Sequence, residues 1–286
     1  MEKHAYLIIA HNNFYILEKL LSLLDNEKND IYVHIDKKVK NFDFNYFTKI
    51  CCKSNLKFIN RIKVYWGGYS QVQCELNLLK KAIENNYEYY HLLSGVDLPI
   101  KSQSYIHDFF DKYKGIEFVR FTNNTWDFER VSKKHFLSNY MKVSNNIQSC
   151  IYKVTNKFVF KFINKDGYNY TKKFEGYKFM KGDQWFSITN ECAHYICKNE
   201  KLIRRMFKYA VGPDEHFIHT ILYNSEFKEK LSNNTCLREI DWERGAPYTY
   251  KAGDYSLLMN SKNSFLITNF QKIYNIIKVN KKGVIL

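Results

Sequence analysis

A chain of 286 residues with 45% hydrophobic residues is long enough to bury a sizeable core and to carry an active site. Its 3 prolines and 11 glycines argue against collagen-like, low-complexity and linker-rich architectures, so we expect one ordered globular body. The sequence has 44 basic and 29 acidic residues, so the formal net charge is +15. Such an excess predicts a negatively charged partner: a phosphorylated substrate, an anionic membrane or nucleic acid.

The cysteines and the N-terminus indicate the compartment. The 7 cysteines are odd in number and contain no C-x-x-C pair, which is typical of reduced thiols. The apolar stretch before His11 is too short for a secretory signal, and no run approaches about 18 apolar residues. We therefore expect a cytoplasmic protein, with peripheral contact with the inner face of an anionic membrane as an open alternative.

Strands and helices alternate in the first third of the chain. The pattern predicts strands at residues 6–10, 30–36, 63–66 and 87–95, and helices at residues 14–24 and 70–86. This alternation predicts an α/β fold whose ligand binds beyond the carboxyl ends of the strands. Polar and aromatic residues follow these ends, namely His11, Asp36, Trp66 and Asp97. Any one of them could be a plain turn former, but together they could line a nucleotide pocket.

The middle of the chain, residues 118–181, is less regular. Within it, Lys153, Lys157, Lys161 and Lys165 recur four apart on a predicted helix of otherwise apolar residues. This helix could lie on an anionic membrane, or it could be a core helix with a solvated lysine stripe, which is the commoner case. A strand running into a helix follows at residues 181–199, and the tail at residues 268–286 is basic and partly amphipathic.

The stretch VGPDEHFIHTIL, residues 211–222, is typical of a helix N-terminus. Pro213 sits in the predicted first turn, and Asp214 and Glu215 lie at the positive end of the helix dipole. The same stretch offers a catalytic carboxylate in Glu215 or part of a zinc site in His216 and His219. Their order is E-H-x-x-H, whereas zinc peptidases carry H-E-x-x-H.

Several motifs are absent from the sequence. It contains no Walker loop, no G-x-G-x-x-G, no G-x-S-x-G and no H-E-x-x-H, so ATPases, dehydrogenases and serine hydrolases lose support. It also lacks the D-x-D pair by which many sugar-nucleotide transferases hold a divalent ion. If a diphosphate binds, lysine and arginine would have to neutralise it.

Seven segments, taken in order, resemble the core-2/I-branching β-1,6-N-acetylglucosaminyltransferase family and its xylosyltransferase relatives. They are AYLIIAHNNFYILEKLLSLL, IYVHIDKK, VYWGGYSQVQCELNLLKKAI, YYHLLSGVDLPIKS, GDQWFSIT, PDEHFIHTIL and GAPYTYKAGD. The resemblance implies a GT-A-like fold with a mixed, mostly parallel central sheet flanked by helices. It also implies one catalytic domain over residues 1–286, with a nucleotide-binding half at about 1–115 and an acceptor and catalytic half at about 116–286.

The resemblance further implies an inverting transfer of a sugar from UDP-GlcNAc, with no cofactor and no metal. Glu215 falls on the catalytic base of the family's Pro-Asp-Glu motif, and the helix dipole would favour its carboxylate form. The donor side includes Asp36 and Asp97, and His11, Tyr65 and Trp66 are expected beside them.

The diphosphate clamp departs from the family pattern. The expected C-terminal lysine is replaced by Thr268 in the string FLITNF. Arg244 and Lys251, on either side of GAPYTY, are the nearest cations, and Lys272 is a further alternative.

On the acceptor side, Glu129 and Arg130 loosely match a family Glu-Arg pair. Trp185 and Trp242 offer faces on which a sugar ring could stack, although tryptophan is more often part of the core. The expected partners are a UDP-sugar and a glycan or lipid-linked glycan in bacterial surface polysaccharide synthesis, with UDP-xylose as an alternative donor and no nucleic acid.

Two rival classes stay open on the sequence. One is a zinc hydrolase built on His216 and His219, and the other is a basic nucleic-acid-binding protein, although no recognised motif supports the latter. A catalytically inactive glycan-binding relative is a third alternative.

Overall fold

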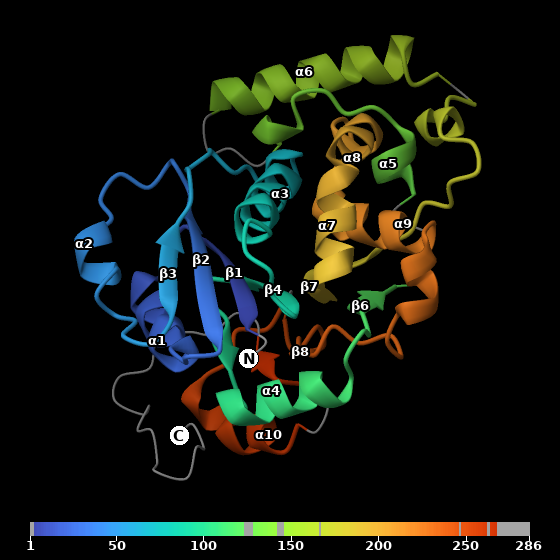
Figure 1. Cartoon of the computed structure of the whole chain (residues 1–286). Helices are drawn as coiled ribbons and strands as arrows, with labels where there is room; N and C mark the ends of the chain where they lie inside the picture. Colours follow the sequence, from blue (N-terminus) through green and yellow to red (C-terminus); the bar gives the residue numbers. More distant parts are fainter. Residues whose placement is uncertain are drawn as a thin grey trace.

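A six-stranded sheet forms the centre of the molecule (Figure 1). The computed structural model describes residues 3–122, 128–141, 146–165, 167–245, 247–261 and 264–267. The strand order is β3-β2-β1-β4-β7-β6, with β1 (His4–Ala10), β2 (Asn29–Ile35), β3 (Asn55–Phe58), β4 (Tyr89–Ser94), β6 (Phe118–Phe121) and β7 (Gly182–Thr189). Strands β3, β2, β1 and β4 are parallel, whereas β7 runs antiparallel to both β4 and β6. The predicted α/β fold, with a mixed, mostly parallel central sheet flanked by helices, is confirmed.

Both faces of this sheet are covered by helices. Successive residues of β1 enter different cores: Leu7 packs in the cluster that contains α3 (Ser70–Ala82), and Ile8 in the cluster that contains α1 (Phe14–Leu24). All seven residues of β2 are buried. Burial of both faces of a strand is what a parallel sheet between two helical layers requires.

The second half of the chain completes the α3 side and extends the molecule. Helices α7 (Asn190–Lys198), α8 (Glu200–Phe207) and α9 (Phe217–Tyr223) contribute apolar residues to the core that contains α3. Helix α6 (Asn146–Phe162) lies across the top of the molecule in Figure 1. Because β7 pairs with β4, the two predicted halves share one sheet.

A smaller sheet has the order β5-β9-β8 and joins β5 (Leu98–Pro99), β8 (Arg238–Glu239) and β9 (Leu266–Ile267). Helices α4 (Gln103–Lys112) and α10 (Tyr255–Met259) lie at the end of the molecule opposite α6 (Figure 1). The remaining short elements are α2 (Phe44–Phe47), α5 (Glu129–Ser132) and the 3-10 helices Ser138–Tyr140, Tyr170–Lys173, Pro213–Glu215, Glu226–Lys230 and Ala252–Asp254.

Three predicted elements differ from the structure. The strand predicted at residues 63–66 is wrong, because β3 occupies the place beside β2 and the chain then passes beyond the end of that strand. The helix predicted at residues 70–86 ends early, at Ala82. The helix predicted from residue 212 is divided into the 3-10 turn Pro213–Glu215 and α9, because His216 takes a non-helical φ of −124°.

Among the described residues, no helix has both the length and the apolar composition needed to cross a bilayer. The predicted amphipathic tail at residues 268–286, including Thr268 and Lys272, lies outside the described residues.

Candidate active site

A cavity of about 570 Å³ opens at the carboxyl ends of β1, β2 and β4. His11 and Asp36 follow β1 and β2, and Ser94 ends β4, so the topology brings three loops to one edge of the sheet. The lining residues are Ile9, His11, Asp36, Lys38, Val64, Trp66, Gln71, Ser94, Asp183, Gln184, Trp185, Asp214, Glu215, Ile240, Trp242 and Pro247. Three of the four residues predicted to meet at this edge, His11, Asp36 and Trp66, line the cavity, whereas Asp97 does not.

Asp36 is held rigidly within this cavity. Its side chain is buried, and Oδ1 accepts a hydrogen bond of 2.8 Å from the backbone N–H of Lys38. The Lys38 Nζ lies 3.3 Å from Asp36 Oδ2, donates to the Val64 carbonyl at 2.6 Å, and sits 4.8 Å from the centre of the Tyr65 ring. Tyr65 thus supports Lys38 and is not itself among the lining residues. Sequence reasoning missed Lys38, although it stands two positions after Asp36.

Three tryptophans give the cavity flat apolar walls. Trp66 is 56% exposed and Trp242 is 57% exposed, which is unusual for such large side chains. Trp185, predicted on the acceptor side, lines the same cavity as His11 and Asp36. Aromatic faces of this kind can stack on a uracil base or on the apolar face of a sugar ring.

Glu215 stands between this cavity and a second one of about 470 Å³. The second cavity is lined by Trp66, Gly67, Gln71, Arg130, Met141, Val211, Gly212, Asp214 and Glu215. Gly212 adopts a φ of +61°, a left-handed conformation that favours glycine, and this starts the 3-10 turn that carries Glu215. The glutamate is therefore presented by a turn ahead of α9 rather than by the first turn of an α-helix.

Two cations contact the Glu215 carboxylate. Oε2 lies 3.2 Å from Arg130 Nη1 and 3.4 Å from Lys181 Nζ. The Glu215 side chain is 37% exposed, so it also meets the solvent of the cavities. Arg130, which was predicted on the acceptor side, lines the second cavity and contacts Glu215, and its role stays a prediction. Its neighbour Glu129 is exposed and does not line either cavity.

Two buried carboxyl groups lie behind Glu215. Asp214 Oδ2 accepts a 2.7 Å hydrogen bond from Gln71 Nε2, and Glu75 Oε1 accepts one of 2.7 Å from Gln184 Nε2. Burial, together with the neighbouring Glu215 charge, raises the pKa of Asp214 to about 7. Burial and the nearby Asp214 also raise the pKa of Glu75 well above its ordinary value. Both groups are thereby biased toward the neutral form.

The two histidines of the predicted zinc alternative contact backbone carbonyl groups inside the protein. His216 and His219 are both buried, with His216 Nδ1 3.2 Å from the Met180 carbonyl oxygen and His219 Nε2 3.1 Å from that of Arg120. Burial lowers the pKa of His219 to about 3, so its ring is neutral. Among the described residues, no group of three or more His, Cys, Asp or Glu could hold a metal ion.

Other predicted donor residues are engaged elsewhere. Asp97 is fully buried and accepts hydrogen bonds from the Ser94 backbone N–H at 2.8 Å and the Ser94 hydroxyl at 2.6 Å, which closes the turn after β4. Arg244 pairs with Asp241 at 2.5 Å and with Asp254 at 2.8 Å. The Lys251 side chain is exposed, and neither cation lines the larger cavity. Their roles at the donor stay predictions.

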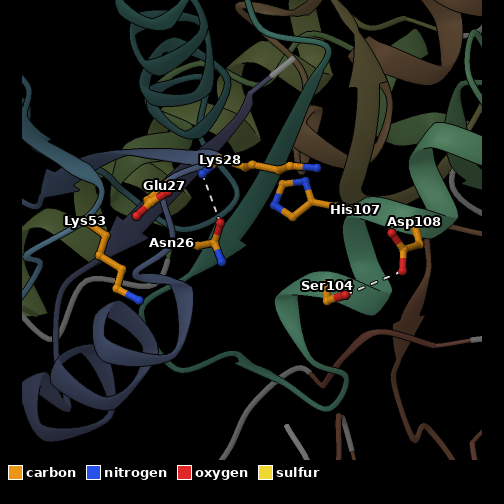
Figure 2. Close-up of a pocket in the computed structure, with 7 residues that line it drawn as sticks. All are labelled: Asn26, Glu27, Lys28, Lys53, Ser104, His107 and Asp108. Carbon is orange, nitrogen blue, oxygen red and sulfur yellow. Dashed lines mark hydrogen bonds between the residues drawn. The ribbon is translucent and has the colours of Figure 1, made fainter. Parts of the chain in front are cut away.

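A further cavity of about 370 Å³ lies at the opposite edge of the sheet (Figure 2). It is formed by the loop before β2, which carries Asn26 and Lys28, and by α4, which carries Ser104, His107 and Asp108. Because it sits where β2 begins, it is separated from Glu215 by the length of the strands. We therefore do not assign the reaction to it.

The raised pKa of Asp214 predicts a specific pH dependence of stability. Between its ordinary pKa near 3.8 and the folded value of about 7, the folded protein keeps a proton that the unfolded chain releases. The free energy of unfolding should therefore fall as the pH rises through this window, by about 1.4 kcal/mol for each unit of pKa difference. Asp214→Asn should reduce this fall, as measured by urea unfolding at pH 4.5 and 7.5. The exposed Asp111→Asn variant is the matched control, and equal falls in all three proteins would contradict the assignment.

The chain is similar in sequence to proteins named xylosyltransferases. Xylosyltransferase 2 of Rattus norvegicus is 24% identical over 263 residues, a match that covers 86% of this chain and 28% of that protein. Xylosyltransferase 1 of Homo sapiens is 21% identical over 263 residues, covering 86% of this chain and 25% of that protein. The chain thus spans less than a third of the length of these relatives.

Among solved structures, mouse xyloside xylosyltransferase 1 matches over 93% of this chain and 97% of its own, with 9% identity and a TM-score of 0.39. The fold class follows from the strand order of the central sheet. The model of the Core-2/I-Branching enzyme family matches residues 4–280. This match extends over nearly the whole chain and includes every residue that lines the two cavities beside Glu215, and so the chain belongs to the Core-2/I-Branching enzyme family.

Proposed function

We propose that the chain is an inverting glycosyltransferase that moves N-acetylglucosamine from UDP-GlcNAc to a hydroxyl group of a glycan acceptor. Membership of the Core-2/I-Branching enzyme family supports this class of reaction. The observation that carries the assignment is the position of Glu215, which lines both the larger and the smaller cavity. A catalytic base must lie next to both the bound donor and the bound acceptor, and a residue that lines both cavities satisfies this requirement.

In this proposal the UDP-sugar occupies the larger cavity and the acceptor occupies the smaller one. Arg130 and Lys181 hold Oε2 of Glu215, and Oε1 accepts the proton of the acceptor hydroxyl. The acceptor oxygen then bonds to the anomeric carbon from the face opposite UDP, while the bond from that carbon to the diphosphate oxygen breaks. UDP leaves with the bonding electrons, and the anomeric configuration is inverted.

The diphosphate needs positive charge when it leaves. Lys38 is the lysine in the lining of the larger cavity, at the edge where the nucleotide would lie. We assign it to the diphosphate, with Arg244 and Lys251 as the predicted alternatives and no metal ion required. The tryptophan faces of Trp66 and Trp242 would stack on the base or the sugar.

The donor sugar and the acceptor are finer points of the proposal. UDP-xylose is the second candidate donor, because the similar proteins reported above are named xylosyltransferases. For the acceptor we propose a glycan or lipid-linked glycan in bacterial surface polysaccharide synthesis, with β-1,6 linkage. Such a reaction would take place in the cytoplasm or at the inner face of the membrane.

The direct test is UDP release in the presence of EDTA. UDP-GlcNAc, UDP-xylose, UDP-glucose and UDP-galactose are offered separately, with and without a panel of glycan acceptors. We expect turnover of UDP-GlcNAc that depends on an acceptor and persists in the chelator. Turnover of UDP-xylose instead would show that xylose is the donor sugar. Turnover only after a divalent ion is added would contradict the metal-independent mechanism. The absence of any UDP binding would contradict the assignment as a transferase.

Glu215→Gln should reduce turnover by about 10²-fold or more, because the amide cannot accept the acceptor proton. UDP binding, measured by calorimetry, should be unchanged, since the base does not hold the nucleotide. The exposed Glu229→Gln variant removes the same charge on the Glu226–Lys230 turn and should behave like the unmodified protein. If Glu215→Gln lost UDP binding together with its thermal stability, Glu215 would be a structural residue.

Lys38→Ala should weaken UDP binding by about 10-fold, because one charge-assisted contact to a diphosphate is lost. Uridine binding should change much less, since uridine carries no phosphate. Arg244→Ala and Lys251→Ala test the predicted alternatives in the same assay. A loss confined to either of these variants would move the clamp away from Lys38.

A further inference from the structure

Helix α6 (Asn146–Phe162) presents a row of large apolar side chains to solvent. Ile147, Ile151, Val154, Phe158 and Phe162 are 71%, 48%, 64%, 60% and 50% exposed. Their spacing of four, three, four and four residues keeps them on one side of a helix that turns through 100° per residue. We call these five residues the apolar row. A row of five exposed large apolar side chains on a folded protein points to an interaction site.

The apolar row does not result from a loosely attached helix, because α6 is anchored through its opposite side. Asn156 is buried there and donates a 2.9 Å hydrogen bond to the carbonyl group of Phe136, outside the helix, and Val159 is also buried. Just after the helix, Asn164 bonds the backbone of Lys134 in both directions, at 3.0 and 2.8 Å. These contacts fix which side of α6 faces outward.

Positive charge borders the apolar row. Lys153, Lys157 and Lys161 run along one edge of it and are exposed, as the sequence predicted for this lysine stripe, and the sequence of α6 contains no Asp or Glu. A cavity of about 490 Å³ lies beside the end of α6, where Lys134 is bonded to Asn164. The cations in its lining are Lys134, Lys173, Lys201, Arg204, Arg205 and Lys208, and its described lining contains no carboxylate.

We propose that α6 docks the protein flat on the surface of an anionic lipid bilayer. The apolar row enters the region between headgroups and acyl chains, and the three lysines bind the phosphates of the headgroups. Helix α6 is about 25 Å long, which suits a helix lying in the interface. A second copy of the chain is the alternative covering partner, but antiparallel pairing of two apolar rows would bring the two lysine rows to the same edge.

The docking element is also connected to the candidate active site. Segment 133–136 is contacted by Asn156 of α6 and by Asn164 just after the helix. This segment directly follows α5, which carries Arg130, the residue that contacts Glu215. Docking through α6 would therefore hold the smaller cavity near the membrane, where a lipid-linked acceptor lies. That last step rests on the proposed function, whereas the docking itself does not.

The test is flotation of the full chain with vesicles of phosphatidylcholine, with and without phosphatidylglycerol. We expect binding to the anionic vesicles that weakens with added salt. The double variant Ile151→Ser and Phe158→Ser should bind at least about 10-fold more weakly, because two apolar side chains no longer enter the interface. The double variant Lys153→Gln and Lys157→Gln should lose about 10-fold on anionic vesicles.

A matched control changes two exposed apolar residues elsewhere, Tyr46→Ser on α2 and Leu257→Ser on α10, and should bind like the unmodified chain. Equal binding by the apolar-row variant and this control, or no binding by the unmodified chain, would overturn the proposal. Analytical ultracentrifugation showing a dimer that only the apolar-row variant dissolves would assign the row to a second copy. UDP release with a soluble acceptor should survive in every variant, so its absence in the unmodified chain would count against the proposed function and not against docking.

Discussion

The parallel pairing of β1 with β2 and β4 is the constraint on which the rest of the structure depends. Parallel strands need crossover connections, so helices cover both faces and the strands are buried along most of their length. The same pairing forces the loops after β1, β2 and β4 to one edge of the sheet. His11, Asp36 and Ser94 meet in one cavity for this reason. The fold thus creates a polar site without any of these residues being close in sequence.

Within that cavity, acidic groups outnumber the basic ones, which is unexpected for a site that should hold a diphosphate. Each carboxyl group is compensated locally. Asp36 pairs with Lys38, Asp183 with Arg120, and Glu215 with Arg130 and Lys181. Asp214 is the exception, and its burial raises its pKa to about 7 instead. The cavity is therefore closer to neutral than its residue types indicate, and a nucleotide does not meet a field of uncompensated negative charge.

Features of the site that are set by the order of the strands could be predicted from the sequence. Features that depend on contacts between side chains far apart in the sequence could not. The convergence of His11 and Asp36 follows from strand order and was predictable, whereas Trp66 reaches the cavity from a loop and not from the strand predicted before it. The position of a long side chain is not: Arg244 is drawn between Asp241 and Asp254, and Lys181 reaches Glu215 across the space between two elements. Asp97 also follows a strand, yet its carboxylate turns back to Ser94. The strand beside β2 was placed at residues 63–66, because the true strand β3 has only four residues, half of them exposed, and gives a weak apolar pattern.

The positions of the charged residues distinguish two proposed tasks, binding of UDP and docking on an anionic membrane. The net charge of the sequence alone does not distinguish them. A net charge of +15 predicted a negatively charged partner, and UDP alone would satisfy that prediction. Yet the lining of the larger cavity contains a single lysine among the described residues, Lys38, whereas the cavity beside α6 contains six cations. Three more lysines follow the apolar row of α6. Binding one diphosphate does not require charge in those places. A flat anionic surface does, because its potential acts on every cation within about 8 Å at physiological salt. Under the proposed docking of α6, we assign the excess charge mainly to an anionic lipid surface and not to the proposed nucleotide.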